Sequence, residues 1–127
     1  MSSDLNVKTQ RLLKSFQYAF SGIKAAILAE KNMRIHLFIS MLVIIFGLWF
    51  SLTIVEWVVI LFAIGGMLAL EMINSAIERL VDLVTEEYHP LAKSAKDIAA
   101  GAVLIYAITS VIVGLLIFLP KIFLIFF

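Results

Sequence analysis

Long apolar runs decide which folds are open to this chain. The run at 35–55 has 21 residues and would rise about 31 Å as a helix, which matches a hydrocarbon core about 30 Å thick. The run at 101–119 is free of charge for 19 residues. Hydrophobic residues make up 63% of the 127, against roughly 45–50% in an ordinary soluble domain. A soluble fold of this size could not bury so much apolar surface. We therefore expect an all-α integral membrane protein with a single membrane domain, residues 1–127.

The composition excludes several kinds of site. The chain has no cysteine, which rules out disulfides and thiolate metal sites. Its net charge of +1 argues against nucleic acid as a partner. The sequence contains no G-x-x-x-x-G-K-[ST] phosphate loop, no protein-kinase signature set and no G-x-S-x-G nucleophile elbow. Any nucleotide would bind to a site outside those common designs. The first thirty residues hold no continuous apolar core, so we expect no cleaved signal peptide.

The N-terminal segment 7–29 has the pattern of an amphipathic helix. Apolar residues recur at spacings of three or four and fall within an arc of about 80°: Leu12, Phe16, Phe20, Ile23 and Ile27. Arg11, Lys14 and Ser21 point away from that arc. This pattern is typical of a helix that lies in the membrane interface, and the alternative is a surface helix packed on a soluble core. The apolar character of the remaining chain favours the interfacial helix.

Three membrane helices are expected after this segment, at 35–55, 57–84 and 91–119. Glu56 interrupts the apolar pattern and is expected to mark a short turn. Pro90 suits the first turn of the third span, and Pro120 is expected to end it. The 14 apolar residues from Trp57 are too few to span alone, so the second helix should continue to residue 84.

The basic residues predict how the spans are oriented. Six precede the first span, none lies between the first and second, and only Lys121 follows the third. The second junction has three, namely Arg79, Lys93 and Lys96. The positive-inside rule places the N-terminus and the second junction in the cytoplasm and the C-terminus outside.

A polar face continues from the apolar half of the second helix. On a helical wheel four residues fall within about 80°: Glu71, Asn74, Glu78 and Asp82. Acids that share one face repel each other, so they need bound cations, basic partners or protons. A polar residue at membrane depth is a functional candidate by default, which singles out Glu71 and Asn74. Asp82 is expected to be a solvated residue at the helix end.

Other charged residues should meet this face near the cytoplasmic boundary. Glu30 and Glu78 could together hold Mg²⁺, which accepts few protein ligands and keeps waters or phosphates. Lys96 could neutralise phosphate charge. Glu71 would lie deepest, where it could act as a general base for an alcohol. On spacing alone, His89 is an ordinary loop residue.

The motifs 71-EMINSAIE-78 and 87-EYHPLAKSAKDIAAGAVL-104 closely resemble the small prokaryotic diacylglycerol kinase family. The resemblance covers nearly the whole chain. It implies a homotrimeric membrane enzyme with three spans and a surface helix per protomer. Such an enzyme transfers the γ-phosphoryl group of ATP to a lipid hydroxyl, with Mg²⁺ as cofactor.

The resemblance also implies roles for individual residues. Glu71 would be the catalytic base, Asn74 would organise the site, and Glu30 and Glu78 would be the metal-linked carboxylates. The implied ATP-binding residues are Arg11, Tyr18, Glu30, Glu78, Glu87, Tyr88, His89, Lys96 and Asp97. For His89 this reverses the interpretation from spacing.

The lipid substrate is a choice between two members of one class. The segment HPLAKSAKDIAAGAV is more similar to the undecaprenol kinases of Gram-positive bacteria than to the diacylglycerol kinases, which favours undecaprenol. Nothing in residue spacing decides between the two. A small transport or proton-relay subunit is a more distant alternative, because acids within spans also mark ion paths. A non-catalytic membrane assembly factor is another. A relay needs polar residues across the whole membrane, and the outer half of this chain has few.

Overall fold

The computed structural model describes residues 1–127 and consists of helices without any strand. The elements in order are α1 (Ser2–Ala29), α2 (Lys31–Trp49), α3 (Ile54–Val84) and α4 (Pro90–Phe126). The three later helices are long and apolar enough to cross a membrane. The expectation of an all-α chain with three membrane helices and an N-terminal helix is therefore confirmed.

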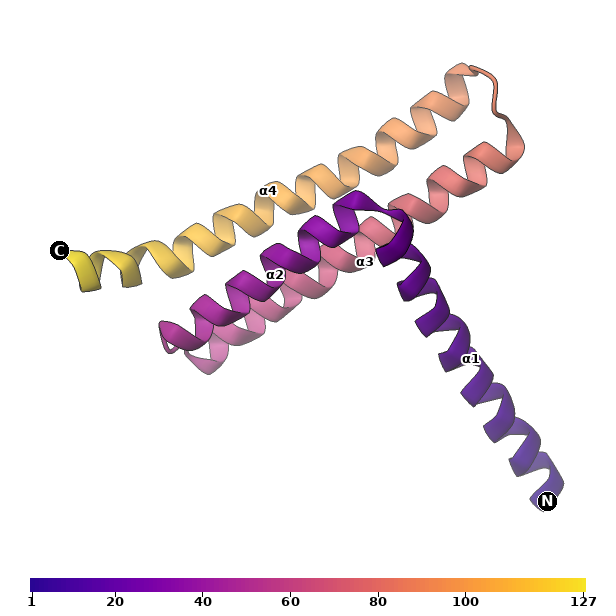
Figure 1. The fold of residues 1–127 in the computed structure, drawn as a ribbon, viewed down its shortest axis with the longest axis horizontal. Helices are drawn as coiled ribbons and strands as arrows, with labels where there is room; N and C mark the ends of the chain where they lie inside the picture. The colour runs from indigo at the N-terminus through magenta and orange to yellow at the C-terminus, as the bar shows by residue number, and fades with distance from the viewer.

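The helices form a three-helix bundle with one helix projecting from it. α3 and α4 run antiparallel side by side, α2 packs along the first half of α3, and α1 leaves the bundle at a steep angle (Figure 1). The bend between α1 and α2 is at Glu30, whose backbone is extended. The Arg34 guanidinium donates to the carbonyls of Ile27 and Leu28, both at 2.9 Å. These bonds satisfy free carbonyls at the end of α1 and so stabilise the bend.

The projecting helix α1 is solvent-exposed along nearly its whole length. Only Ala26 is buried, where α1 meets the bundle. Phe16 and Phe20 are among its exposed apolar residues. A helix with an uncovered apolar stripe and a basic opposite face fits the predicted interfacial placement, which stays a prediction. It begins at Ser2, five residues before the predicted start at 7.

The turn between the first two spans differs from the prediction. α2 begins at Lys31 and ends at Trp49, not at residue 55. Ser51 adopts a positive φ of 54°, which ends the helix. Thr53 then caps α3: its hydroxyl accepts from the Glu56 amide, and the Glu56 carboxylate accepts from the Thr53 amide. Glu56 is thus part of a capping box inside α3 and does not mark the turn itself.

The prediction that Pro120 ends the last helix is wrong. α4 continues through Pro120 to Phe126. Proline removes one backbone hydrogen bond, but a membrane helix tolerates it where neighbouring groups hold the chain. Here the Lys121 ammonium lies 3.0 Å from the Glu56 carboxylate, and the ring of Phe118 packs edge-on against Phe50. Both contacts fix the last turns of α4 to the turn between α2 and α3.

A close helix contact joins α3 to α4. The Tyr106 hydroxyl donates to the Phe62 carbonyl at 2.7 Å. It lies over Gly66, where an added Cβ would come within 1.9 Å of the hydroxyl oxygen. Gly66 is therefore a helix-packing site, where only a residue without a side chain allows Tyr106 to approach. Only 10 of the 127 residues are buried, so most of the apolar surface needs lipid or other chains to cover it.

Candidate active site

The polar face predicted on α3 is present and is graded by burial. Glu71 is 3% exposed and Asn74 is 9% exposed, so both are part of the core. Glu78, one turn after Asn74, is half-buried, and Asp82 is exposed. The Glu71 carboxylate makes no hydrogen bond or ion pair within the chain. The face therefore runs from a buried, unpaired acid to solvent within three helical turns.

Asn74 is bound at one end of its side chain and free at the other. Its amide nitrogen donates to Oε1 of Glu78 at 3.4 Å. Its carbonyl oxygen is buried and has no hydrogen-bond partner. An unpaired buried acceptor costs about 1–3 kcal/mol, so it is expected only where something outside the chain supplies a partner. A donor or a cation bound beside Asn74 would satisfy it.

Glu30 lies close to α3, where its carboxylate pairs with Arg79, the residue that follows Glu78. The Arg79 guanidinium is 3.7 Å from the Glu30 carboxylate. The Arg79 side chain is 55% exposed, so this ion pair contributes at most about 1 kcal/mol and is easily exchanged for another cation. The charge pattern of the sequence does not predict this partner for Glu30, which the bend at the α1–α2 junction brings to α3.

The donor set suits Mg²⁺ better than a metal that needs a full protein cage. The chain has no cluster of three or more possible ligands among histidines and acids. Mg²⁺ is commonly held by one or two carboxylates, with waters and substrate phosphates completing the octahedron. Glu30 and Glu78 are the two carboxylates that the sequence predicts for the metal, and the unpaired oxygen belongs to Asn74, which bonds to Glu78. The residues present therefore fit the predicted metal.

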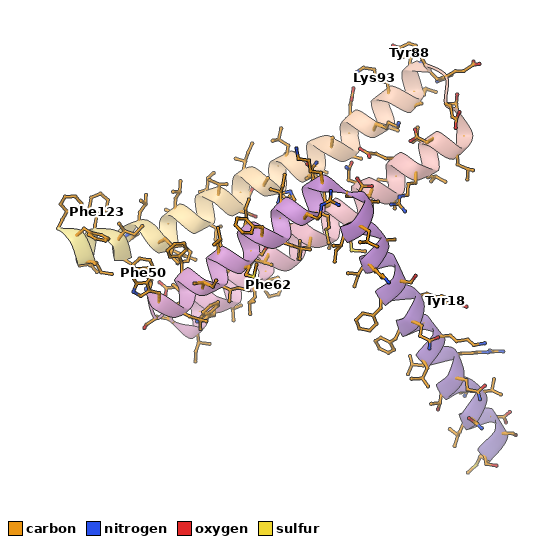
Figure 2. The ribbon with its side chains drawn as sticks, in the orientation of Figure 1. Tyr18, Phe50, Phe62, Tyr88, Lys93 and Phe123 are labelled. Carbon is orange, nitrogen blue, oxygen red and sulfur yellow. The ribbon has the colours of Figure 1, made fainter.

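A second part of the site is a hollow of about 350 Å³ at the tip of the α3–α4 hairpin. Its lining includes Asp82, Glu87, Tyr88, His89 and Lys96. Four of these five were predicted to bind ATP, and the hairpin brings them together. Figure 2 shows Tyr88 at this tip, with Lys93 close behind it on α4.

Local hydrogen bonds shape the hairpin loop. The Thr85 hydroxyl accepts from the Glu87 amide at 3.2 Å, which forms a tight turn after α3. Nδ1 of His89 accepts from the Leu91 amide at 3.1 Å and so caps α4, with Pro90 at the first helical position. His89 therefore has a structural role through Nδ1, and its other ring nitrogen remains available to a ligand.

The charged residues on and near this hollow form ion pairs with one another. The Lys96 ammonium bonds to Asp82 across the hairpin, and Lys93 bonds to Asp97 along α4. Asp82 is exposed, as expected of a solvated residue at the helix end, and the antiparallel packing of α3 on α4 also places Lys96 beside it. Asp97 is exposed and is not in the lining of the hollow. Lys96 is thus available to phosphates only by exchange with Asp82.

Two predicted ATP-binding residues lie apart from the hollow. Arg11 and Tyr18 are exposed on α1, and Figure 2 shows Tyr18 on the projecting part of that helix. α1 contacts α2 and α3 but not α4. A single chain therefore does not bring these two side chains to Lys96 or to the hairpin loop.

Sequence reasoning missed two arginines that shape the site and a buried neighbour of Asn74. Ser75 is 5% exposed and buried beside Asn74. Arg79 neutralises Glu30, and Arg34 holds the bend that places Glu30. Ser75 carries no charge to attract attention. The sequence indicates the two arginines only as positive charges. Their partners depend on the angles between helices, which the sequence pattern does not give.

Comparison with known proteins gives consistent matches. Residues 17–118 match the family described as prokaryotic diacylglycerol kinase. The chain is 48% identical over 120 residues to the undecaprenol kinase of Bacillus subtilis, covering 94% of this chain and 98% of that protein. It is 44% identical to a diacylglycerol kinase of Synechocystis, over 86% of this chain and 63% of that protein. It is 32% identical to the diacylglycerol kinase of Escherichia coli, over 80% and 84% respectively.

Proposed function

We propose that undecaprenol is the lipid substrate of this chain, which belongs to the prokaryotic diacylglycerol kinase family. As a member of that family it is a membrane lipid kinase that uses ATP as co-substrate. The proposed reaction transfers the γ-phosphoryl group of ATP to the hydroxyl of undecaprenol and gives undecaprenyl phosphate and ADP.

One observation carries the choice of undecaprenol. Identity to the Bacillus subtilis undecaprenol kinase is 48% over nearly the full length of both chains. Identity to the Escherichia coli diacylglycerol kinase is 32% over a shorter region. The Synechocystis diacylglycerol kinase, at 44%, keeps diacylglycerol as the alternative substrate, with the same mechanism.

The proposed general base is Glu71. It lies within a membrane helix, is almost fully buried and has no partner in the chain, so its carboxylate is available to accept the proton of a lipid hydroxyl. The hydroxyl oxygen then bonds to the γ-phosphorus as the bond from that phosphorus to the β–γ bridging oxygen breaks, and ADP leaves. The reaction needs positioning and charge neutralisation more than covalent catalysis.

Glu30 and Glu78 are proposed to hold Mg²⁺, with the free carbonyl oxygen of Asn74 as a further acceptor nearby. When bound, the cation would neutralise charge on the transferring phosphates. Binding would replace the loose pair between Arg79 and Glu30 and would release the guanidinium toward the phosphates.

The hollow at the hairpin tip is proposed to bind the nucleotide. Lys96 would exchange Asp82 for phosphate oxygens, and Tyr88 offers an exposed aromatic face for the base. Glu87 and His89 would contact the ribose or base edge, while Asp97 is proposed to contact the base. The exposed positions of Arg11 and Tyr18 on α1 suit contacts that form in an assembly of several chains.

The proposed setting is the bacterial plasma membrane, with the N-terminus and the site in the cytoplasm and the C-terminus outside. We propose a homotrimer, with membrane lipids covering the outer surface. The large uncovered apolar area supports association. The separation of Tyr18 from the hairpin loop supports a site that is shared between chains.

The test is an assay in mixed micelles with labelled ATP, Mg²⁺ and either undecaprenol or diacylglycerol. We expect label in the lipid fraction, and we expect kcat/KM to be larger for undecaprenol than for diacylglycerol. Label in neither lipid would contradict the kinase assignment. A larger kcat/KM for diacylglycerol would identify diacylglycerol as the substrate, and the proposed mechanism would not change. Omitting Mg²⁺, or replacing it with Ca²⁺, tests the metal in the same assay.

A further inference from the structure

A groove runs along the inside of the membrane helices, between α2 and α4. No Cα atom of α2 lies within 8 Å of one in α4, although both pack near α3. The space between them contains two hollows, of about 250 Å³ and about 430 Å³. Val43 lines both hollows, so they are neighbours along one path. We refer to this path as the α2–α4 groove.

The groove begins at the candidate base. Its floor in the first hollow is the face of α3 that includes Ile60 and Met67, which are 3% and 6% exposed. Glu71 follows Met67 by four residues and so lies on the same face of the helix, one turn further on. A hydroxyl held at Glu71 would therefore have the rest of its molecule at the mouth of the groove.

The groove ends in a wholly apolar, aromatic hollow at the turn between α2 and α3. Its lining includes Phe46, Trp49, Phe50 and Phe118. Figure 2 shows Phe50 and Phe123 at this same end of the molecule. From Ala107 to Phe126, the groove residues of α4 rise about 28 Å at 1.5 Å per residue, which is nearly the thickness of the hydrocarbon core.

Small residues keep the first hollow open. Ala107 and Gly114 line it from α4, and Ala63 lines it from α3. A Cβ added at Gly114 would meet nothing within 4 Å, so the space beside this glycine is empty of protein. Eight of the twelve lining residues are hydrophobic, which suits a hydrocarbon occupant.

We propose that the α2–α4 groove binds the first isoprene units of a polyprenol whose hydroxyl is at Glu71, and that it thereby selects one long isoprenoid chain over a diacylglycerol. This inference rests on the proposed lipid kinase function. The groove is a single track between two helices, which accommodates one chain. Its aromatic end offers ring faces to the double bonds and methyl branches of such a chain.

The test narrows the groove at Gly114 and measures chain-length dependence. Gly114→Leu should lower kcat/KM for undecaprenol by at least about tenfold, since a misfit of a few methyl groups in an apolar pocket has that effect. Farnesol, a short isoprenoid alcohol, should be phosphorylated within about twofold of the wild-type rate by the same variant, because it ends before the blocked position. Gly114→Ala adds one methyl group and should give an intermediate ratio.

A matched control adds the same bulk outside the groove. Thr109 is exposed, does not line either hollow, and bonds only to the Ile105 carbonyl of its own helix. Thr109→Leu should leave the undecaprenol-to-farnesol ratio unchanged. Circular dichroism reports whether Gly114→Leu is folded, independently of either rate.

A second measurement uses the unaltered protein. Undecaprenol with a photoreactive group at a mid-chain isoprene unit should label Phe46 or Phe118 in the groove, and not Leu124, which is 85% exposed. Label only on outward-facing residues would overturn the proposal.

The other possible results also distinguish the groove proposal from its alternatives. Equal losses for both alcohols would overturn the groove proposal while the kinase function stands. A change in oligomer size with an unchanged ratio would instead identify the groove as a contact for a second copy of this chain. If wild type phosphorylates neither alcohol, the proposed function fails and the groove proposal fails with it.

Discussion

Asn74 donates its side-chain amide to Glu78 at 3.4 Å, while its own carbonyl oxygen is buried without any partner. This arrangement lowers the stability of the isolated chain, and it leaves the Asn74 oxygen free to accept a hydrogen bond or bind a cation beside the Glu78 carboxylate. Functional sites are where such unsatisfied groups are expected to persist, because ligand binding repays the loss.

The first prediction separates stability from activity at this position. Asn74→Leu removes the unpaired acceptor, so the free energy of unfolding in micelles should stay the same or rise by about 1 kcal/mol. The rate of phosphoryl transfer should nevertheless fall by at least about tenfold, because the acceptor near Glu78 is lost. Denaturation with SDS and the lipid kinase assay measure the two effects.

The control for Asn74 is its buried neighbour. Ser75→Ala should change both quantities by less than about threefold or 1 kcal/mol, since it removes only a small hydroxyl. If Asn74→Leu lost stability and kept its activity, the residue would be structural only.

The second prediction concerns the candidate base. Glu71→Gln keeps the size of the side chain and removes its ability to accept a proton. We expect kcat for lipid phosphorylation to fall by about 10²–10⁴ while the KM for ATP stays unchanged. Asp4→Asn, at the exposed start of α1, is the matched control and should behave as wild type. Full turnover by Glu71→Gln would remove the assignment of the base.

Much of the fold could be predicted because apolar run length reflects membrane thickness directly. The number of spans followed from it, and the polar face of α3 followed from helical periodicity. The helix ends did not, because they depend on individual contacts. The α2–α3 turn is set by the Thr53–Glu56 capping box, and α4 continues past Pro120 with help from Lys121.

The residues of the candidate site could be proposed from the sequence, but the ion pairs among them could not. The partner of Glu30 depends on the bend between α1 and α2, and the partner of Lys96 depends on the register of α3 against α4. Neither is encoded by spacing along one helix. The isolated position of Tyr18 on α1 likewise follows from the direction in which that helix leaves the bundle (Figure 1).

The third prediction tests the contact between α3 and α4. Gly66→Ala would place a methyl carbon 1.9 Å from the Tyr106 hydroxyl oxygen, so the ring must move and its bond to the Phe62 carbonyl is lost. We expect a loss of about 1–3 kcal/mol in the free energy of unfolding. Gly65→Ala is the adjacent control, because nothing lies within 4 Å of its added Cβ. Equal losses from the two variants would show that the Tyr106 contact is not the cause.

The fourth prediction uses the ion pair across the hairpin. Lys96→Met should raise the KM for ATP by about tenfold, the effect of losing one hydrogen bond to a charged group. Asp82→Asn should leave this KM the same or lower it, because Asp82 competes with phosphates for the same ammonium. Lys121→Met removes an equal charge at the opposite end of the bundle and should not change the KM. A rise in KM with Asp82→Asn would mean that the pair itself builds the site.

The fifth prediction concerns the start of α3. Thr53→Ala removes the hydroxyl that accepts from the Glu56 amide, and loss of such a cap costs about 1 kcal/mol. The free energy of unfolding in micelles should fall by that amount, while Thr53→Ser, which keeps the hydroxyl, should match wild type. The KM for ATP should be unchanged in both, because the cap lies at the opposite end of α3 from Glu78. A changed KM in Thr53→Ala would instead indicate that the turn is coupled to the site, through the pair between Glu56 and Lys121 that fixes α4 to α3.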